Sequence, residues 1–545
     1  MLSPPNFLIL VLLLATGVSS LTFKPAQKRG GPDFQHLQKR EVDPASLYPE
    51  HNISVPIDYF HNDTSYEPHS NGTFDLRYWF DASYFKDGGP VIVLQSGETD
   101  GTGRLPFLQK GLLHQLAQAT NGIGVVLEHR YYGTSFPTPD LSTANLRFLT
   151  TEQALADMAY FAQHVVFEGL EDKNLTAPET AYFGYGGSYA GAFVAFLRLV
   201  YPDIYYGTIS SSGVTEAIWD FWRYYEPVRE YGPPDCISSH TKLINVADNI
   251  LQNNTKYTLQ FKTAFGLEGI TYDDDFAQVL SYPIGGWQGR NWDPEVNDPS
   301  FDEYCGNITY PSLINNSSAN ATTSIRELLD AGGYSNNASA LTVPMSNFIN
   351  YVKKTYVSPV LDSDEDQTLD QAYSTHNQTF YNLDDLSQGW RSWPYQYCTQ
   401  WGYLQTGSGV PADRLPLVSR LLTLQYNSLI CRYAFNITTP PDTDAINKYG
   451  GFNITYPRLA IIDGEEDPWR GASPHSVLAK NGGNRTSTIE EPFLLIEGAV
   501  HHWDENGLFP NETTATLPPA PVKEVQAQEV GFVKAWLEEF RAGKP

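Results

Sequence analysis

Short apolar segments alternate with helical patterns over residues 78–166 of this chain. Residues 90–97 (PVIVLQSG) and 122–130 (GIGVVLEHR) are rich in β-branched side chains. Residues 112–120 (LLHQLAQAT) and 151–166 (TEQALADMAYFAQHVV) carry apolar side chains near helical spacing. Strands that alternate with helices of this length predict a mainly parallel sheet with helices on both faces.

The same alternation resumes near the end of the chain. Residues 457–464 (PRLAIIDG) and 492–498 (PFLLIEG) are short apolar runs that predict two more strands. An amphipathic helix is predicted over residues 522–540. Between about residues 216 and 425 the alternation disappears, so we predict that this part is a largely helical insertion at one end of the sheet.

The N-terminal residues have the pattern of a secretory leader. An apolar run over residues 7–15 is followed by small residues up to Ser20, and it is far shorter than the roughly 20 residues that span a membrane. Residues 1–20 therefore predict a signal peptide rather than a membrane anchor. Dibasic pairs, the second ending at Arg40, are consistent with a propeptide over residues 21–40.

Glycosylation sequons are dense, and behind a signal peptide they mark surface positions of a secreted protein. The fifteen Asn-x-Ser/Thr sites are Asn52, Asn62, Asn71, Asn174, Asn253, Asn307, Asn315, Asn316, Asn320, Asn337, Asn377, Asn436, Asn453, Asn484 and Asn511.

The chain has four cysteines, Cys236, Cys305, Cys398 and Cys431. An even count in an oxidising compartment, with no Cys-x-x-Cys pair, favours two disulfides over metal ligation. Three pairings exist, and we adopt the nearest-neighbour one, Cys236 with Cys305 and Cys398 with Cys431.

The formal net charge is -27 at pH 7, which argues against nucleic acid as a partner. The excess of acids also suits an environment below neutral pH, where protonation of carboxylates reduces self-repulsion.

Small residues are crowded around one serine in residues 183–192 (FGYGGSYAGA). In an α/β-hydrolase the nucleophile lies on a strained turn between a strand and a helix, so the positions two before and two after it must be small. Gly186 and Ala190 satisfy this requirement around Ser188. The alternative is a glycine-rich turn that only packs a helix on a strand. A phosphate-binding loop is excluded, because its glycine spacing and lysine are missing.

A serine nucleophile needs backbone donors for the oxyanion. The N–H of Tyr189, at the start of the following helix, is one candidate. The loop after residues 90–95 supplies the second donor in this fold, which points to Gly97 or to Glu98.

A base and an orienting acid are expected after the serine, in the order Ser, Asp, His. The end of one late strand offers the acids Asp463, Glu465, Glu466 and Asp467, and the end of the next offers His501 and His502. The residues alone leave open which acid and which histidine act. Residues 128–130 (EHR) close a predicted buried strand, and we assign them a structural role.

Five motifs resolve that choice through a resemblance: 186–191 (GGSYAG), 127–137 (LEHRYYGTSFP), 146–158 (LRFLTTEQALADM), 467–469 (DPW) and 501–504 (HHWD). Together they resemble the proline-specific serine peptidases that include lysosomal prolyl carboxypeptidase, dipeptidyl peptidase II and the fungal acid prolyl endopeptidases. The similarity runs from about residue 54 through the terminal helix and is weakest over 240–390.

The resemblance implies that Asp467 is the acid, that His501 is the base and that Trp469 lines a pocket for proline. It also implies an α/β-hydrolase fold with an inserted helical cap. The expected organisation is therefore a hydrolase domain over 41–215 and 426–545, with the cap over 216–425. Some relatives carry His-His-x-Asp-x-Arg, but Asn506 takes the place of that arginine here, which leaves the role of His502 open.

The hypothesis from the sequence is a secreted serine peptidase that cleaves peptides after proline, at acidic pH, without a metal or organic cofactor. A lysosomal or vacuolar location is the alternative to secretion, and neither a membrane nor nucleic acid is an expected partner. Carboxypeptidase, dipeptidyl peptidase and endopeptidase modes stay open. The rival functions are an esterase or lipase of the same fold and a binding protein without catalysis.

Overall fold

The computed structural model describes residues 44–314, 319–362 and 367–543. The predicted signal peptide (1–20) and propeptide (21–40) lie outside the described residues.

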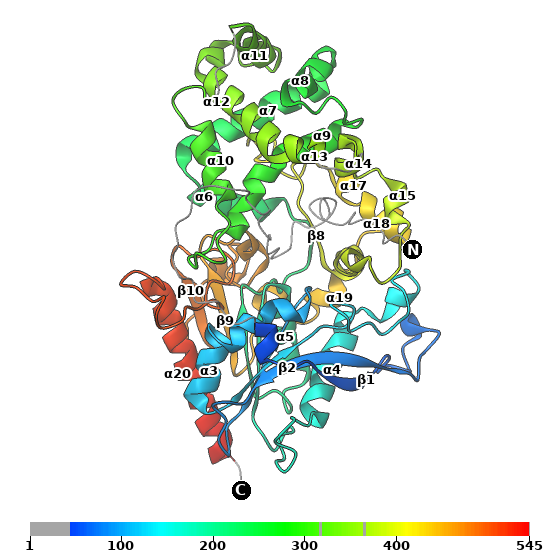
Figure 1. Cartoon of the computed structure of the whole chain (residues 1–545), viewed down its shortest axis with the longest axis vertical. Coiled ribbons are helices and arrows are strands. Elements are labelled where there is room, and N and C mark those ends of the chain that lie inside the picture. Colours follow the sequence, from blue (N-terminus) through cyan, green and yellow to red (C-terminus); the bar gives the residue numbers. More distant parts are fainter. Residues whose placement is uncertain (1–43, 315–318, 363–366, 544–545) are drawn as a thin grey trace.

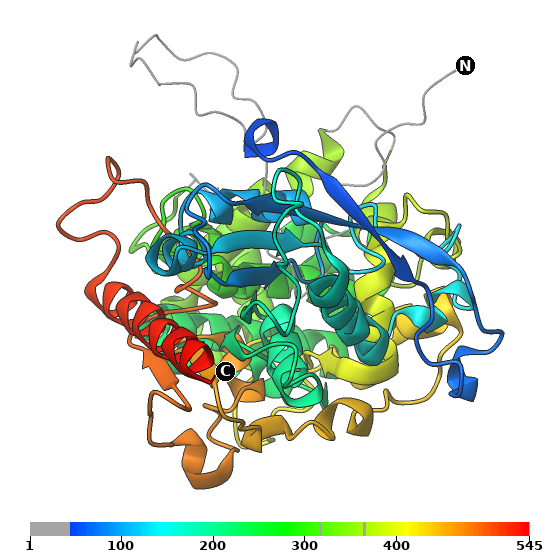
Figure 2. The same ribbon diagram turned by 90° about the horizontal axis from the view of Figure 1, so that it is seen from below.

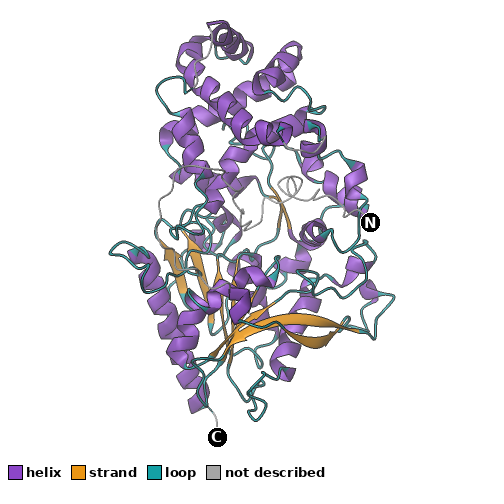
Figure 3. Ribbon diagram, in the orientation of Figure 1, coloured by secondary structure: helices purple, strands orange, loops and turns teal. Residues whose placement is uncertain are grey.

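A sheet of eight strands forms the centre of one part of the molecule (Figure 1, Figure 3). Its order is β1-β2-β4-β3-β5-β6-β9-β10, with β1, β2 and β4 paired antiparallel and the remaining neighbours parallel. The strands are β1 (His51–Pro56), β2 (Thr73–Asp81), β3 (Val91–Gln95), β4 (Ile123–Leu127), β5 (Tyr182–Gly187), β6 (Gly207–Ser211), β9 (Leu459–Gly464) and β10 (Phe493–Ile496). The strands predicted on both sides of the insertion therefore join one sheet.

Helices cover both faces of this sheet, as the alternation predicted. They are α3 (Leu112–Thr120), α4 (Thr151–His164), α5 (Tyr189–Val200) and α20 (Ala520–Ala542). Successive side chains of β3 point to opposite faces. Val93 packs in one buried cluster with Met158 of α4, whereas Ile92 packs in a second cluster with Leu113 of α3 and Trp536 of α20. Figure 2 shows α20 along one side of the sheet.

The chain between β6 and β9 is mostly helical, and most of its helices lie at the end of the molecule opposite the C-terminal end of α20 (Figure 1). Its α-helices are α6 (Glu226–Tyr231), α7 (Pro234–Asn253), α8 (Thr258–Phe265), α9 (Asp273–Gly285), α10 (Ser300–Ile308), α11 (Ala319–Ala331), α12 (Ala338–Val352), α13 (Ser358–Leu361), α14 (Leu369–Tyr373), α15 (Gln378–Tyr381), α16 (Ser392–Gln396), α17 (Leu424–Asn427), α18 (Leu429–Phe435) and α19 (Asp444–Asn447).

The insertion also contains a short parallel pair that the sequence pattern did not indicate. β7 (Ile218–Asp220) pairs with β8 (Gly402–Leu404), so the first and later parts of the insertion meet. Three-residue strands are too short to produce a period-two signal in the sequence. The domain boundaries at 216 and 425 stay a prediction.

Both predicted disulfide pairings are confirmed. Cys236 of α7 is bonded to Cys305 of α10, and Cys398 is bonded to Cys431 of α18. Each bond therefore joins two separate helical segments of the insertion.

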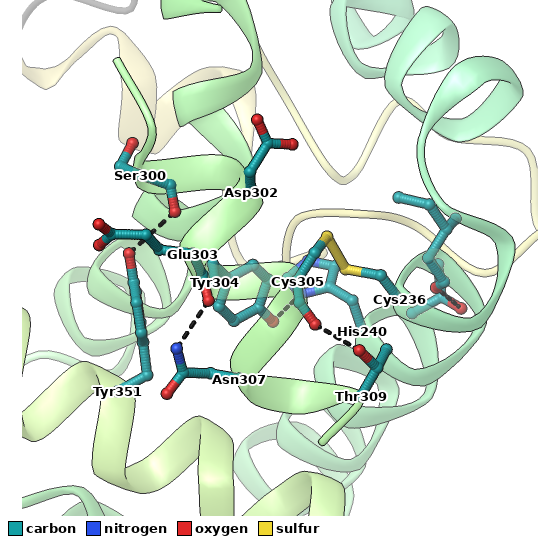
Figure 4. Close-up of a disulfide and its surroundings, with 12 residues drawn as sticks. Cys236, His240, Ser300, Asp302, Glu303, Tyr304, Cys305, Asn307, Thr309 and Tyr351 are labelled. Carbon is teal, nitrogen blue, oxygen red and sulfur yellow. Dashed lines mark hydrogen bonds between the residues drawn. A yellow bond between two sulfur atoms is a disulfide. The ribbon is translucent and has the colours of Figure 1, made fainter. Parts of the chain in front are cut away.

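Polar contacts surround the first of these bonds (Figure 4). The ring Nδ1 of His240 lies 2.6 Å from the Tyr304 hydroxyl, and its Nε2 lies 2.7 Å from the carbonyl of Leu417. The Tyr351 hydroxyl donates to the carbonyl of Ser300 at 3.1 Å. Burial lowers the pKa of His240 to about 4, so the ring is neutral and belongs to the core of the insertion.

Most sequons lie on the surface, where a glycan would be accommodated. The exposed ones are Asn52, Asn62, Asn71, Asn174, Asn253, Asn337, Asn436, Asn453, Asn484 and Asn511. Asn307 and Asn377 are half-buried, and Asn315 and Asn316 lie outside the described residues. Within the described ranges, no helix combines the length and the apolar character needed to cross a membrane.

Candidate active site

Ser188 occupies a sharp turn between β5 and α5. Its backbone has φ +60° and ψ -126°, a conformation that is costly for a residue with a Cβ. A Cβ on Gly186 would lie 2.4 Å from the carbonyl oxygen of Ala190, and one on Gly191 would lie 2.6 Å from the carbonyl oxygen of Ser211. The turn therefore requires glycine at 186 and 191, and its geometry is that of a nucleophile elbow.

The neighbouring strand β6 holds this turn. The N–H of Ser188 donates to the carbonyl of Ser211 at 2.9 Å. Tyr189 is the first residue of α5, so its N–H has no acceptor within the helix and lies at the positive end of the helix dipole. The backbone thus leaves the Tyr189 N–H as a donor beside the serine.

The loop after β3 reaches the same turn. A Cβ on Gly97 would lie 3.5 Å from the Cβ of Ala190, and Gly97 has φ +75°. However, the Gly97 N–H already donates to the side chain of Gln95 at 2.5 Å. To stabilise an oxyanion, the Gly97 N–H would have to give up its hydrogen bond to the Gln95 side chain. Its role, like that of Glu98, stays a prediction.

Asp467 and His501 meet at the ends of two late strands. Asp467 follows β9 and caps a 3-10 turn, Pro468–Ala472, by accepting the Trp469 N–H at 2.9 Å. Its other carboxylate oxygen lies 2.9 Å from Nδ1 of His501. Both side chains are buried. The structure therefore brings together the acid and the histidine that the resemblance selected.

The electrostatics of Asp467 favour a carboxylate. Burial acts to raise the pKa of Asp467, but the charge and hydrogen bond of His501 and the Trp469 N–H hold it below its usual value. An ionised Asp467 fixes the His501 proton on Nδ1. The other nitrogen, Nε2, makes no hydrogen bond within the described part of the chain and is the one available to a serine hydroxyl.

Two serines at the end of β6, Ser211 within the strand and Ser212 just after it, connect these parts, and the sequence reasoning missed them. Ser211 accepts from Ser188, as above. The hydroxyl of Ser212 accepts the N–H of His502 at 2.9 Å and its hydrogen bond also helps to lower the pKa of Asp467. The signal was visible as a run of serines, 210–212, at the end of an apolar strand, but no sequence rule gives such a run a role.

His502 lies against the nucleophile turn. Its Cγ would be 3.2 Å from a Cβ on Gly187, and its ring centroid is 4.5 Å from that of His501. Its Nδ1 lies 2.9 Å from a carboxylate oxygen of Glu505, which in turn is 3.8 Å from the guanidinium of Arg104. Burial opposes ionisation of Glu505, but Arg104 and His502 hold its pKa below the usual value. Arg104, from the 3-10 helix Gly101–Leu108 after β3, therefore places a cation near His502 even though position 506 is Asn.

Trp469 is buried in an aromatic group rather than open to solvent. Its side chain is 1 % exposed. Phe221, Tyr224 and Tyr403 pack on it with ring centroids 5.1 to 5.4 Å away, and the His501 ring is at 6.5 Å. The indole therefore lies close to the acid and the histidine, as expected, and its contact with substrate stays a prediction.

The charged residues at the end of β4 are structural, as assigned from the sequence. Glu128 pairs with Arg77 at 2.6 Å, and Arg130 pairs with Asp157 at 2.6 Å. His129 donates from Nδ1 to the carbonyl of Arg130 at 2.7 Å.

His129 also supports the turn indirectly. Its Nε2 lies 3.0 Å from the Tyr189 hydroxyl, which accepts from the amide of Gln396 at 2.8 Å. Burial lowers the pKa of His129 to about 3, so its Nε2 is an acceptor. The first residue of α5 is therefore anchored by one residue of the sheet domain and one of the helical insertion.

Comparison with known proteins gives matches over most of the chain. The family model described as serine carboxypeptidase S28 matches residues 61–281 and 298–517. A protein from Arthroderma benhamiae named probable extracellular serine carboxypeptidase is 50% identical over 533 residues, which cover 97% of this chain and 74% of the relative. Serine protease vicPb from Bipolaris victoriae is 30% identical over 456 residues, covering 79% of this chain and 81% of the relative.

Among solved structures, a proline iminopeptidase from Mycobacterium smegmatis aligns with 90% of this chain and 99% of its own, at 10% identity and a TM-score of 0.33.

Proposed function

The chain belongs to the serine carboxypeptidase S28 family and is a serine-type peptidase, and from this premise we propose that it hydrolyses peptide bonds on the carboxyl side of proline. In this proposal Ser188 is the nucleophile, His501 the general base and Asp467 the residue that orients the base. The observation that carries it is the buried Asp467 to His501 contact of 2.9 Å, with Nε2 of His501 left without a partner among the described residues.

The reaction follows from these positions. Ser188 Oγ attacks the peptide carbonyl while its proton passes to His501 Nε2, and the N–H of Tyr189 stabilises the oxyanion. The imidazolium then gives the proton to the departing amine, which leaves an acyl-enzyme. Water, deprotonated by the same ring, attacks the ester and releases the acid, and Ser188 regains its proton. Peptides are the substrate class that the family implies.

Specificity for proline is supported by the surroundings of the histidine. A proline ring is flat and apolar and its nitrogen carries no N–H, so it suits an aromatic wall. Trp469, buried with Phe221 and Tyr403 packed on it, places an aromatic group next to His501, with ring centroids 6.5 Å apart.

Secretion and acidic working conditions complete the proposal. Secretion is supported by the predicted leader and by the extracellular relative. Work below neutral pH is supported by the net charge of -27 and by buried carboxyls, Asp248 and Asp275 among them, whose pKa burial raises. Such groups are protonated at low pH at no cost, whereas ionising them in the folded state at neutral pH is unfavourable.

The test uses two peptides with a single internal proline, one blocked at both ends and one free, incubated at about pH 4.5, where carboxylates are partly protonated. Mass spectrometry of the products is compared for the wild type and Ser188→Ala. We expect cleavage after proline that is absent in the variant, and the peptide that is cut identifies the exopeptidase or endopeptidase mode. Cleavage at other residues only, or equal cleavage by the variant, would contradict the proposal.

A further inference from the structure

We propose that Asp504 and Glu529 share one proton in the active enzyme, and that this carboxyl pair holds the segment carrying His501 against the two strands that hold Ser188. The inference rests on the proposed role of His501 as the base. It makes both acids positioning residues, which act on the reaction through the histidine segment and not by contact with substrate.

Asp504 connects three parts of the site. It lies three residues after His501 and is 1 % exposed. One carboxyl oxygen accepts from the hydroxyl of Ser211 at 2.5 Å, and the other accepts from the hydroxyl of Tyr185 at 3.1 Å. Tyr185 is on β5, three residues before Ser188, and Ser211 ends β6. The Asp504 side chain thus ties the histidine segment to both strands of the nucleophile turn.

Glu529 lies on α20 one turn after Gln526, whose amide donates to the carbonyl of Asp504, and its carboxyl interacts with the Asp504 side chain. The Glu529 side chain has no exposed surface, and neither carboxyl oxygen accepts a hydrogen bond within the described ranges. Two facing buried carboxyls cannot both be ionised without a large cost, and one proton between them relieves it. The proton bound between the two carboxyls therefore supplies the hydrogen bond that Glu529 otherwise lacks.

The helix also holds the backbone of the same segment. The amide of Gln526, one turn before Glu529 on α20, donates to the carbonyl of Asp504 at 2.7 Å and to that of Asn506 at 2.8 Å. If the carboxyl pair became doubly ionised, α20 and the histidine segment would repel each other at the place where these bonds join them.

The charged and titratable groups around the pair do not neutralise it. Tyr185 faces it from β5, and His502 and Glu505 act on it from the histidine segment. Among the described residues, no lysine or arginine lies at ion-pair distance from either carboxyl. Burial raises the pKa of Asp504 to about 6, and burial together with Asp504 raises that of Glu529 well above its usual value.

The direction of the pH effect follows. In the unfolded chain both acids titrate near pH 4, so from there to about pH 6 and above the folded enzyme binds more protons than the unfolded chain. The stability that the protonated pair contributes is present at low pH and is lost as the pH rises through this range. A histidine base alone would give activity that rises with pH to a plateau. The pair adds a fall in activity on the neutral side.

The experiment compares the wild type with Glu529→Gln, whose amide can donate to an ionised Asp504 without a shared proton. Glu524→Gln, an exposed acid on the same helix, is the matched control. The measurements are kcat and KM for one proline peptide and the unfolding midpoint, at about pH 5 and about pH 7.5. We expect the ratio of kcat at the higher pH to kcat at the lower pH to increase at least about threefold in Glu529→Gln, with little change in KM.

The unfolding midpoint should also fall less between these pH values in Glu529→Gln than in the wild type or the control. A pH dependence identical to that of the wild type would overturn the proposal. If Glu529→Gln does not fold, Asp504→Asn takes its place.

Infrared spectra of the wild type give a direct reading as well. Because other buried carboxyls also have raised pKa values, the reading is the difference spectrum, wild type minus variant: a protonated carboxyl component above about pH 5 that only the wild type contains is expected, and a difference spectrum without it would also overturn the proposal. Neither the midpoint nor the spectrum needs turnover, so both stand if Ser188→Ala shows that the proposed function is wrong.

Discussion

The N–H of Ser188 donates to the carbonyl of Ser211 at 2.9 Å, so the residue at the turn is fixed by the strand next to its own. This bond keeps Ser188 at φ +60°, where a side chain is unfavourable. The strain has a measurable consequence for both stability and activity.

Replacing Ser188 by glycine or alanine is predicted to separate these two properties. Both variants lose the nucleophile, so kcat/KM should fall at least about a thousandfold. Glycine adopts positive φ freely, so Ser188→Gly should be roughly 1 kcal/mol more stable than Ser188→Ala. Thermal or denaturant unfolding of the two variants gives the comparison. Equal stability would mean that the turn relaxes, and retained activity would remove Ser188 from the mechanism.

Asp467→Asn is predicted to reduce kcat on the order of a thousandfold or more, because an amide can donate to Nδ1 of His501 and place the ring proton on Nε2. KM should change little. Steady-state kinetics on a proline peptide, with Glu466→Gln on the same loop as the control, checks this. A loss of less than about tenfold would argue against Asp467 as the orienting acid.

The same substitution has a pH-dependent effect on stability. The pKa of Asp467 is lowered in the folded enzyme, so the carboxylate contributes stability that is present above its unfolded pKa, about 4, and is lost as the pH falls through the folded value. The difference in free energy of unfolding between Asp467→Asn and the wild type should therefore be larger at about pH 6 than at about pH 3. A difference that is constant with pH would contradict this account.

Tyr189→Phe tests whether the hydrogen bonds of the Tyr189 hydroxyl hold the first residue of α5 in place. The change removes the hydroxyl between His129 and Gln396 and leaves the buried His129 Nε2 without a donor, at a cost of about 1 to 3 kcal/mol in stability. Because the Tyr189 backbone N–H stays, kcat should fall only several-fold. The control is Tyr310→Phe, at a tyrosine that is 52% exposed. The unfolding midpoint and kcat of both variants are compared with those of the wild type. No change in either quantity would show that the anchor does not act.

Trp469 is predicted to set the preference for proline. Trp469→Phe keeps an aromatic ring but loses the bond from Nε1 to Gln288, now 2.9 Å, and shrinks the apolar surface near His501. The ratio of kcat/KM for a proline peptide over its alanine analogue should fall by about tenfold. Trp219→Phe, at an exposed indole, is the control. An unchanged ratio would limit Trp469 to packing.

Loss of the Cys236–Cys305 bond should lower the free energy of unfolding without lowering kcat. The bond spans 69 residues, and the chain-entropy relation gives about 4 kcal/mol for a loop of this length. The double variant with serine at both positions should unfold at a lower temperature and keep its kcat at temperatures where it is folded. A large loss of kcat in folded protein would show that the insertion shapes the active site through this bond.

The sequence was sufficient for the elements whose pattern is local. Alternating apolar runs located β3, β4, β9 and the terminal helix, and the small residues around Ser188 predicted the turn. The choice of Asp467 among four acids needed the resemblance, because all four lie within residues 463–467 at the end of one strand and only the fold decides which of them meets His501.

What the sequence left out depends on contacts between distant segments. Arg104 approaches Glu505 from the 3-10 helix after β3, and no local sequence pattern connects the two residues. The bond from Gly97 to Gln95 depends on a side-chain orientation. Glu529 looked like any polar residue of an amphipathic helix, and its burial against Asp504 follows only from the way α20 packs on the sheet.

The order of the strands along the chain decides when peptidase activity can first appear during synthesis. β6 ends at Ser211 and its neighbour β9 begins at Leu459, so the ribosome completes the serine turn long before it has made the acid and the histidine. In the proposed mechanism, a nascent or truncated chain carries the nucleophile without its base, and the unpaired edge of β6 is exposed to chaperones and proteases. The proposed mechanism therefore gives peptidase activity only once the last strands are made, after the whole insertion has been synthesised.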